Sequence, residues 1–272
     1  MANSDQTGLA SDGANGVPPW HLTAQIQVLR IQDHEWSWAD SGGNGVPVIM
    51  LPGALGTCEV FYKQLSDTRR DIRVIAVSYP GISEPERLAD GLGKLMDHIK
   101  LPKAHVLGSS YGGYWAQFFG VSHADRLETL TIGNSFVEPS GLFANPLFNP
   151  EWVLKSSAEE LQLAWKDAVS KAPPSELRSL QLDMLSGRQS AENFKGRVAG
   201  VVTAKPCPEL NLPLSKLTVL DCDDDPLVGP SMREAVRARY AGATVRTLRT
   251  GGHYPHILNE KAYGETLRSM YL

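Results

Sequence analysis

The chain has 272 residues, a formal net charge of -4, 42% hydrophobic residues and 21% charged residues, which is ordinary for a folded globular protein. The 26 basic and 30 acidic residues include no basic run, which argues against nucleic acid or an anionic membrane surface as a partner. Three widely spaced cysteines, Cys58, Cys207 and Cys222, predict neither a disulfide framework nor a zinc site.

The first 18 residues are rich in Gly, Ser, Asn and Asp, and they contain neither the basic segment nor the apolar segment of a secretory signal. They are therefore predicted to be a disordered leader on a cytoplasmic protein. No apolar stretch approaches the roughly 18 residues that a membrane-spanning helix needs, so no membrane span is expected.

Strand and helix patterns alternate along most of the chain. Residues 24–32 and 34–38 alternate apolar and polar side chains and predict an exposed hairpin. Buried or half-buried strands are expected at 47–51, 72–78, 104–108, 129–133, 216–221 and 243–249. Helices are expected at 57–67, 87–100, 111–121, 230–240 and 256–271. This alternation predicts an α/β fold, a mostly parallel sheet with helices on both faces.

One long interval contains no convincing strand. Residues 137–210 hold helical patterns at 151–169 and 175–187, which predicts a helical lid inserted into the fold. The α/β core is then expected to consist of 19–136 and 211–272.

A candidate nucleophile lies where the strand at 104–108 meets the next helix. Gly108-Ser109-Ser110-Tyr111-Gly112 matches the G-x-S-x-G pattern, with a strand before it and a helix after it. Small residues on both sides of Ser110 are needed because such a turn is tight enough to strain the backbone and lift the hydroxyl clear of the sheet. Ser110 is the predicted nucleophile.

A serine hydroxyl needs a base and an orienting acid. His253 lies in a loop between the last strand and the last helix, and His256 is its nearest competitor. An acidic run follows the penultimate strand, and within it Asp225 is the first choice for the acid, with Asp224 and Asp223 as second choices. The resulting order Ser, Asp, His is that of α/β-hydrolases and excludes the chymotrypsin-like and subtilisin-like orders.

The Gly-rich segment Leu51-Pro52-Gly53-Ala54-Leu55-Gly56 follows an early strand and can turn its amides inward. The backbone N–H groups of Ala54 and Tyr111 are the predicted oxyanion donors, although a Gly-rich turn without catalytic purpose would look the same. A phosphate cradle is disfavoured, and neither a metal nor an organic cofactor is implied.

Large apolar residues of the predicted lid can form a substrate pocket for an uncharged acyl or aromatic group. The same side chains could instead join the lid helices to one another. The predicted lining residues, with Tyr111 beside them, are Leu55, Leu142, Phe143, Phe148, Trp152 and Trp165.

The fragments that carry a family resemblance are LPGALGTCEVFYKQL, SYP, GSSYGGYWAQ, GNSF and TGGHYP. They resemble the α/β-hydrolase superfamily and, within it, the maspardin group. The resemblance places Ser110 at the elbow serine, Ala54 and Tyr111 at the oxyanion turn, and Asp225 or a neighbour at the acid. Members of the maspardin group are regarded as binding or adaptor proteins and carry Asn where this chain has His253.

These features together predict a serine hydrolase that acts on an ester, thioester or lactone carbonyl of a small, largely apolar substrate through a Ser-His-Asp triad and an acyl-enzyme. Two alternatives remain open. One is a non-catalytic binding or adaptor protein with a protein partner, and the other is a cyclase, lyase or acyl transferase on the same fold.

Overall fold

The computed structural model describes residues 17–22, 26–67 and 71–272. The leader predicted at 1–18 lies outside the described residues, except for its last two positions. Eight strands form one sheet, and their bounds are β1 Gln27–Ile31, β2 His34–Asp40, β3 Val48–Leu51, β4 Val74–Ser78, β5 Ala104–Ser109, β6 Leu127–Gly133, β7 Leu217–Cys222 and β8 Thr244–Leu248.

The strands lie in the order β1-β2-β4-β3-β5-β6-β7-β8. All neighbours from β4 to β8 pair in parallel, whereas β1 and β2 are antiparallel to their neighbours. The predicted α/β class with a mostly parallel sheet is therefore confirmed. Parallel strands end at one edge of the sheet, so the loops after β3, β5, β6, β7 and β8 can meet there.

The predicted hairpin exists, but the prediction that it is exposed is wrong for its second strand. β2 pairs with β1 on one side and with β4 on the other, so it is an internal strand. Trp36 and Trp38 on β2 are buried. Their alternation with polar residues reflects the two faces of an internal strand and not an edge in solvent.

Helices cover both faces of the sheet. Neighbouring residues of β6 show this, because Thr131 hydrogen-bonds Tyr271 of one helix while Leu130 lies against Gly120 of another. No helix in the described ranges is long and apolar enough to cross a bilayer. The helices of the core are α1 Tyr62–Leu65, α2 Pro85–His98, α3 Tyr111–Ser122, α8 Pro230–Arg239, α9 Pro255–Leu258 and α10 Glu260–Tyr271.

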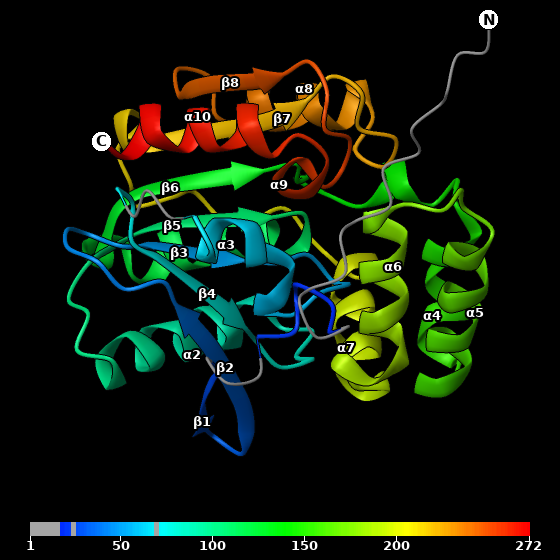
Figure 1. Ribbon diagram of the computed structural model, residues 1–272. Helices are drawn as coiled ribbons and strands as arrows, with labels where there is room; N and C mark the ends of the chain where they lie inside the picture. Colours follow the sequence, from blue (N-terminus) through cyan, green and yellow to red (C-terminus); the bar gives the residue numbers. More distant parts are fainter. Residues whose placement is uncertain (1–16, 23–25, 68–70) are drawn as a thin grey trace, which may run out of the picture.

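Residues 137–210, hereafter the insertion, contain no strand and lie entirely within the described ranges. Its helices lie together, next to the carboxyl-terminal ends of β4 and β6 (Figure 1). The pattern at 151–169 predicted one helix, but Ser156 and Ser157 divide it into two. The helices are α4 Pro150–Lys155, α5 Ala158–Ser170, α6 Glu176–Asp183 and α7 Ala191–Val202, the last of which the sequence patterns did not predict.

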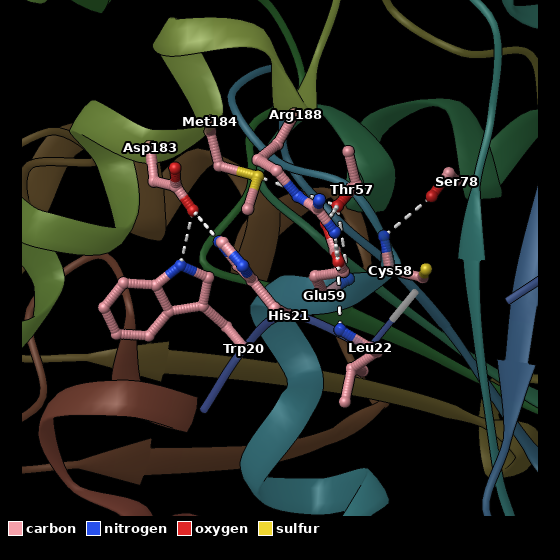
Figure 2. Close-up of polar contacts among 10 residues, drawn as sticks. All are labelled: Trp20, His21, Leu22, Thr57, Cys58, Glu59, Ser78, Asp183, Met184 and Arg188. Atoms are coloured by element: carbon pink, nitrogen blue, oxygen red, sulfur yellow. Dashed lines mark hydrogen bonds and ion pairs between the residues drawn. The ribbon is translucent and has the colours of Figure 1, made fainter. Parts of the chain in front are cut away.

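A short segment near the start of the chain connects the insertion to the core. Figure 2 shows the Trp20 indole and the His21 ring both directed at Asp183, the last residue of α6, with heavy-atom distances of 2.8 and 2.5 Å. Beside them the Leu22 amide donates to the buried Glu59, which also pairs with Arg188 of the insertion. The insertion is thus held to the core by polar contacts on this side.

Candidate active site

Ser110 occupies the turn between β5 and α3. Its φ of 54° and ψ of -121° are strained values for a non-glycine residue, and they belong to the sharp strand-to-helix turn that the G-x-S-x-G spacing predicted. The turn follows β5 directly, and the Ser110 amide donates to Gly133 O at the end of β6. The serine is therefore fixed by the sheet itself.

Three glycines make this turn possible because main chains touch where their side chains would be. A Cβ atom at Gly108 would overlap the carbonyl of Gly112. A Cβ atom at Gly112 would overlap the main chain at Leu51 and Pro52, and one at Gly113 would overlap Gly108 and Ser135. The turn is thus held by close packing of main chain on main chain.

His253 lies in the loop after β8, and its Nδ1 lies 2.9 Å from Asp225 Oδ2. Both side chains are buried. When Nδ1 carries the proton and donates it to the carboxylate, Nε2 is free to accept a proton from a nucleophile. His253 and Ser110 line the same cavity.

Both oxygens of the Asp225 carboxylate accept hydrogen bonds. Besides His253, its Oδ2 accepts from Asn134 Nδ2 at 2.7 Å, and its Oδ1 accepts from the amides of Leu227 and Val228. Burial acts to raise the pKa of Asp225, but the hydrogen bond and charge of His253, together with these donors, outweigh it and hold the pKa below its usual value. Asp225 therefore stays ionised although it is buried.

The neighbouring aspartates have other contacts. Asp224 accepts from the amides of Gly251 and Gly252, so it braces the loop that carries His253. Asp221 pairs with Arg237 through both of its oxygens. Asp223 is exposed and lies 3.9 Å from an Arg233 nitrogen. Among these aspartates only Asp225 contacts a histidine.

The turn after β3 lies against the nucleophile. A Cβ atom at Gly53 would be 3.1 Å from Ser110 Cβ and 3.5 Å from its Oγ. Gly53 and Ala54 line the cavity together with Ser110. Within the described ranges, the Ala54 and Tyr111 amides donate to no protein acceptor. Two unused donors therefore flank the candidate nucleophile.

The cavity has a volume of about 270 Å³ and is lined by residues of both the core and the insertion. Four of the predicted lining residues, Leu55, Leu142, Phe148 and Trp165, line it. The apolar residues that join them, and that the sequence did not single out, are Val60, Phe136, Leu177, Val201, Leu227, Val228 and Leu258.

Three pocket predictions are wrong. Phe143 follows a 3₁₀ turn and is 37% exposed, and Trp152 of α4 is only partly buried; neither side chain lines the cavity. The Tyr111 ring is buried between Tyr79 and Tyr114, and its hydroxyl donates to the carbonyls of Ile82 and Ser83. Only the Tyr111 main chain can serve the site.

His256, the nearest competitor of His253 in the sequence, also lines the cavity. Its ring is buried against Phe61, Tyr254 and Tyr263, and both ring nitrogens lack a partner within the described part of the chain. Burial, with smaller contributions from His253 and Lys63, lowers its pKa to about 3. Among the residues that the structure describes, no carboxylate contacts the His256 ring, whereas His253 contacts Asp225.

Sequence reasoning missed several polar residues around the site. Asn134, which follows β6, has φ of 41° and bridges Asp225 to Gly252 O. Gln189 and Arg197 of the insertion reach the main chain of the turn after β3. These partners lie far from their targets in sequence, so no local pattern marks them.

Comparison with known proteins agrees with this architecture. A family model described as the alpha/beta hydrolase family matches residues 48–265. Human maspardin is 29% identical over 252 residues, which cover 86% of this chain and 79% of maspardin.

Solved structures resemble the whole fold. The enol-lactonase from Burkholderia xenovorans LB400 superposes with a TM-score of 0.72 at 18% identity, covering 90% of this chain and 99% of the lactonase. A thermophilic esterase from Thermogutta terrifontis gives 0.71 at 21% identity, covering 91% and 100%. From the family match over most of its length, the chain belongs to the alpha/beta hydrolase family.

Proposed function

We propose that the protein is a serine hydrolase of small, largely apolar esters, thioesters or lactones. The observation that carries this proposal is that His253, held by a buried hydrogen bond to Asp225, lines the same cavity as the strained Ser110. The Asn134, Leu227 and Val228 donors, which keep Asp225 ionised, favour a histidine that can become a cation during the reaction.

In the proposed reaction, Ser110 Oγ attacks the substrate carbonyl while His253 Nε2 takes its proton. The carbonyl oxygen becomes an oxyanion between the Ala54 and Tyr111 amides. His253 then gives the proton to the departing alcohol, thiol or ring oxygen as the carbonyl reforms, which leaves an acyl-Ser110. Water attacks the acyl group by the same sequence and releases the acid.

The substrate class follows from the cavity. Its lining is mostly aliphatic and aromatic, and about 270 Å³ is small for a ligand pocket. An uncharged acyl group of modest size is therefore favoured over a long chain or a charged one. Activity should fall as the acyl chain of a p-nitrophenyl ester series outgrows the cavity.

The test is labelling with a fluorophosphonate probe, followed by mass spectrometry of the modified peptide. Labelling at Ser110 is expected, and Ser110→Ala should abolish it and lower kcat by about 10⁶-fold. Ser122→Ala is the matched control, because Ser122 lies at the far end of the same helix and its hydroxyl binds Phe118 O. A folded wild-type protein that is not labelled at Ser110 would instead favour a binding function.

A further inference from the structure

Arg197 of α7 is a buried cation without a carboxylate partner in the described part of the chain. Its guanidinium instead donates to main-chain carbonyls. Nη1 lies 2.5 Å from Gly56 O and 3.4 Å from Gly53 O, and Nη2 donates to Tyr79 O. The guanidinium also stacks 3.7 Å from the centroid of the Tyr79 ring. Burying a charge without a carboxylate partner costs free energy, and the hydrogen bonds to main-chain carbonyls offset part of that cost.

Two further side chains bind the same turn. Gln189 accepts from the Gly56 amide and donates to Ala54 O, both at 2.9 Å. The Tyr79 hydroxyl donates to Pro52 O at 2.7 Å and to Gly53 O at 3.2 Å. Burial raises the pKa of Tyr79 to about 12, with Arg197 acting in the opposite direction, so the hydroxyl remains a donor at neutral pH. The carbonyls held in this way are those of Pro52, Gly53, Ala54 and Gly56.

The peptide plane connects these contacts to the candidate oxyanion site. The Gly53 carbonyl and the Ala54 N–H belong to one trans peptide unit, so they point in opposite directions. Tyr79 and Arg197 hold the carbonyl from one side, while Gly53 lies against Ser110. A cation at the carbonyl oxygen also polarises the peptide and strengthens its N–H as a donor.

We propose that Arg197, Gln189 and Tyr79 are positioning residues that aim the Ala54 N–H at the oxyanion, so that the insertion takes part in catalysis as well as covering the cavity. This inference rests on the proposed hydrolase function. The turn needs such support because Gly53 and Gly56 leave its backbone free to adopt other conformations. A displacement of about 1 Å at a reacting centre can cost on the order of 10²-fold in rate.

Three substitutions test the proposal in the full-length protein. Tyr79→Phe removes one hydroxyl and keeps the ring under the guanidinium. Gln189→Leu removes both contacts with the turn, together with the hydrogen bond to Asn193. Arg197→Lys keeps the charge but loses the two-pronged geometry. Arg126→Lys is the matched control, since Arg126 also donates to two main-chain carbonyls, those of Leu101 and Pro102, but far from the cavity.

Each of the three variants should lower kcat for a p-nitrophenyl ester about ten- to a hundredfold with KM changed less than about threefold. Their affinity for an aryl trifluoromethyl ketone, which forms an oxyanion on Ser110, should fall in parallel with kcat/KM. Rates are counted per site labelled by the fluorophosphonate, so that loss of folded protein does not imitate loss of catalysis. Arg126→Lys should match the wild type.

Hydrogen exchange of the peptide that contains residues 51–57 gives a readout independent of turnover. Exchange there should be at least about tenfold faster in Gln189→Leu and Tyr79→Phe, while β5 and β6 stay protected. If exchange at 51–57 or kcat per labelled site is unchanged in both variants, the positioning role is wrong. If the wild type hydrolyses no ester, the proposed function fails, and faster exchange would leave the three residues a structural role only.

Discussion

The two predicted oxyanion donors are held in different ways. The Tyr111 amide belongs to a turn whose shape is set by glycines packed main chain on main chain. The Ala54 amide belongs to a turn whose carbonyls are bound by side chains from elsewhere, chiefly Gln189 and Arg197 of the insertion. One donor depends on steric exclusion and the other on polar contacts.

This difference separates what the core provides from what the insertion provides. Where main chain packs on main chain there is no room for a side chain, so one substitution at a glycine of the Ser110 turn should cause a large loss of activity and stability. Polar contacts can be removed one at a time, so substitutions of the side chains that bind the turn at 53–56 should lower activity by smaller, separate amounts. The insertion can therefore tune the candidate site without disturbing the nucleophile, and the following predictions test that division.

The largest effect is expected on the core side, at the acid. Asp225→Asn keeps the shape of the side chain but removes the charge that stabilises the histidine cation, and it should lower kcat for ester hydrolysis by about 10⁴-fold. The exposed Asp223→Asn, measured in the same assay, should stay within about twofold of the wild type. A greater loss in Asp224→Asn than in Asp225→Asn would show that the acid has been misassigned.

Breaking the elbow should cost stability as well as activity. In Gly112→Ala the new methyl group would come within 2.5 Å of the Leu51 carbonyl oxygen, so urea denaturation should show a loss of about 3 kcal/mol. Gly120→Ala is the control on the same helix, because its methyl group would meet only the ends of leucine side chains at 3.2 and 3.4 Å. Comparable losses in both variants would contradict an elbow held by main-chain packing.

The buried His256 should make the free energy of unfolding fall as the pH is lowered. Its pKa of about 3 in the folded state lies below the 6.5 of an ordinary histidine, so the unfolded chain binds more protons between those values. This group's contribution to stability is complete above about pH 6.5 and is lost as the pH falls toward 3, with a slope of up to about 1.4 kcal/mol per pH unit.

His256→Phe should flatten that slope, as measured by urea denaturation from pH 7 to pH 4. Tyr263→Phe is the matched control, because it alters a ring 5.9 Å away without removing a group that titrates in acid. An identical pH dependence in the wild type and His256→Phe would rule out His256 as the source. Asp225 adds a slope of the same sign near its own lowered pKa, and His256→Phe should leave that part in place.

The smallest effect is expected at the outer face of the insertion. Ser157 and Glu160 form a capping box at the start of α5. Ser157→Ala should lower the free energy of unfolding by about 1 kcal/mol and leave kcat unchanged, since α5 does not contact the turn at 53–56 through this cap. Ser170→Ala, at the other end of α5, is the control. A fall in kcat would mean that the insertion transmits stability changes to the site more widely than the side-chain contacts imply.

Local patterns were sufficient for much of the core. Alternating strands and helices predicted the parallel sheet, and G-x-S-x-G at a strand-helix junction located the strained Ser110. Its loop position after the last strand favoured His253 over His256, and the structure brings His253 to Asp225. These structural features could be predicted because strand periodicity and the strained turn both depend on residues that are close in sequence.

The helices and contacts of the insertion were harder to predict, because its partners lie far away in the sequence and its glycines are unusual in a helix. Gly196 and Gly200 lower the helix propensity of α7, yet they let it approach closely, since Cβ atoms there would overlap the Gly81 carbonyl and the Tyr111 hydroxyl. That close approach brings Arg197 to the turn. The pocket predictions for Phe143 and Trp152 failed for a related reason, because apolar character alone does not say which neighbours a side chain packs against.

The contact of Trp20 with Asp183 joins residues 163 positions apart. During synthesis at about 5–20 residues per second, Asp183 is made roughly 8 to 33 seconds after Trp20. The Trp20–Asp183 contact, drawn in Figure 2, can therefore form only after the chain has been made as far as α6. Until the insertion is made, the cavity-lining residues that precede it in the chain, such as Leu55 and Phe136, lack their partners from the insertion, and apolar surface exposed in this way favours aggregation of the nascent chain.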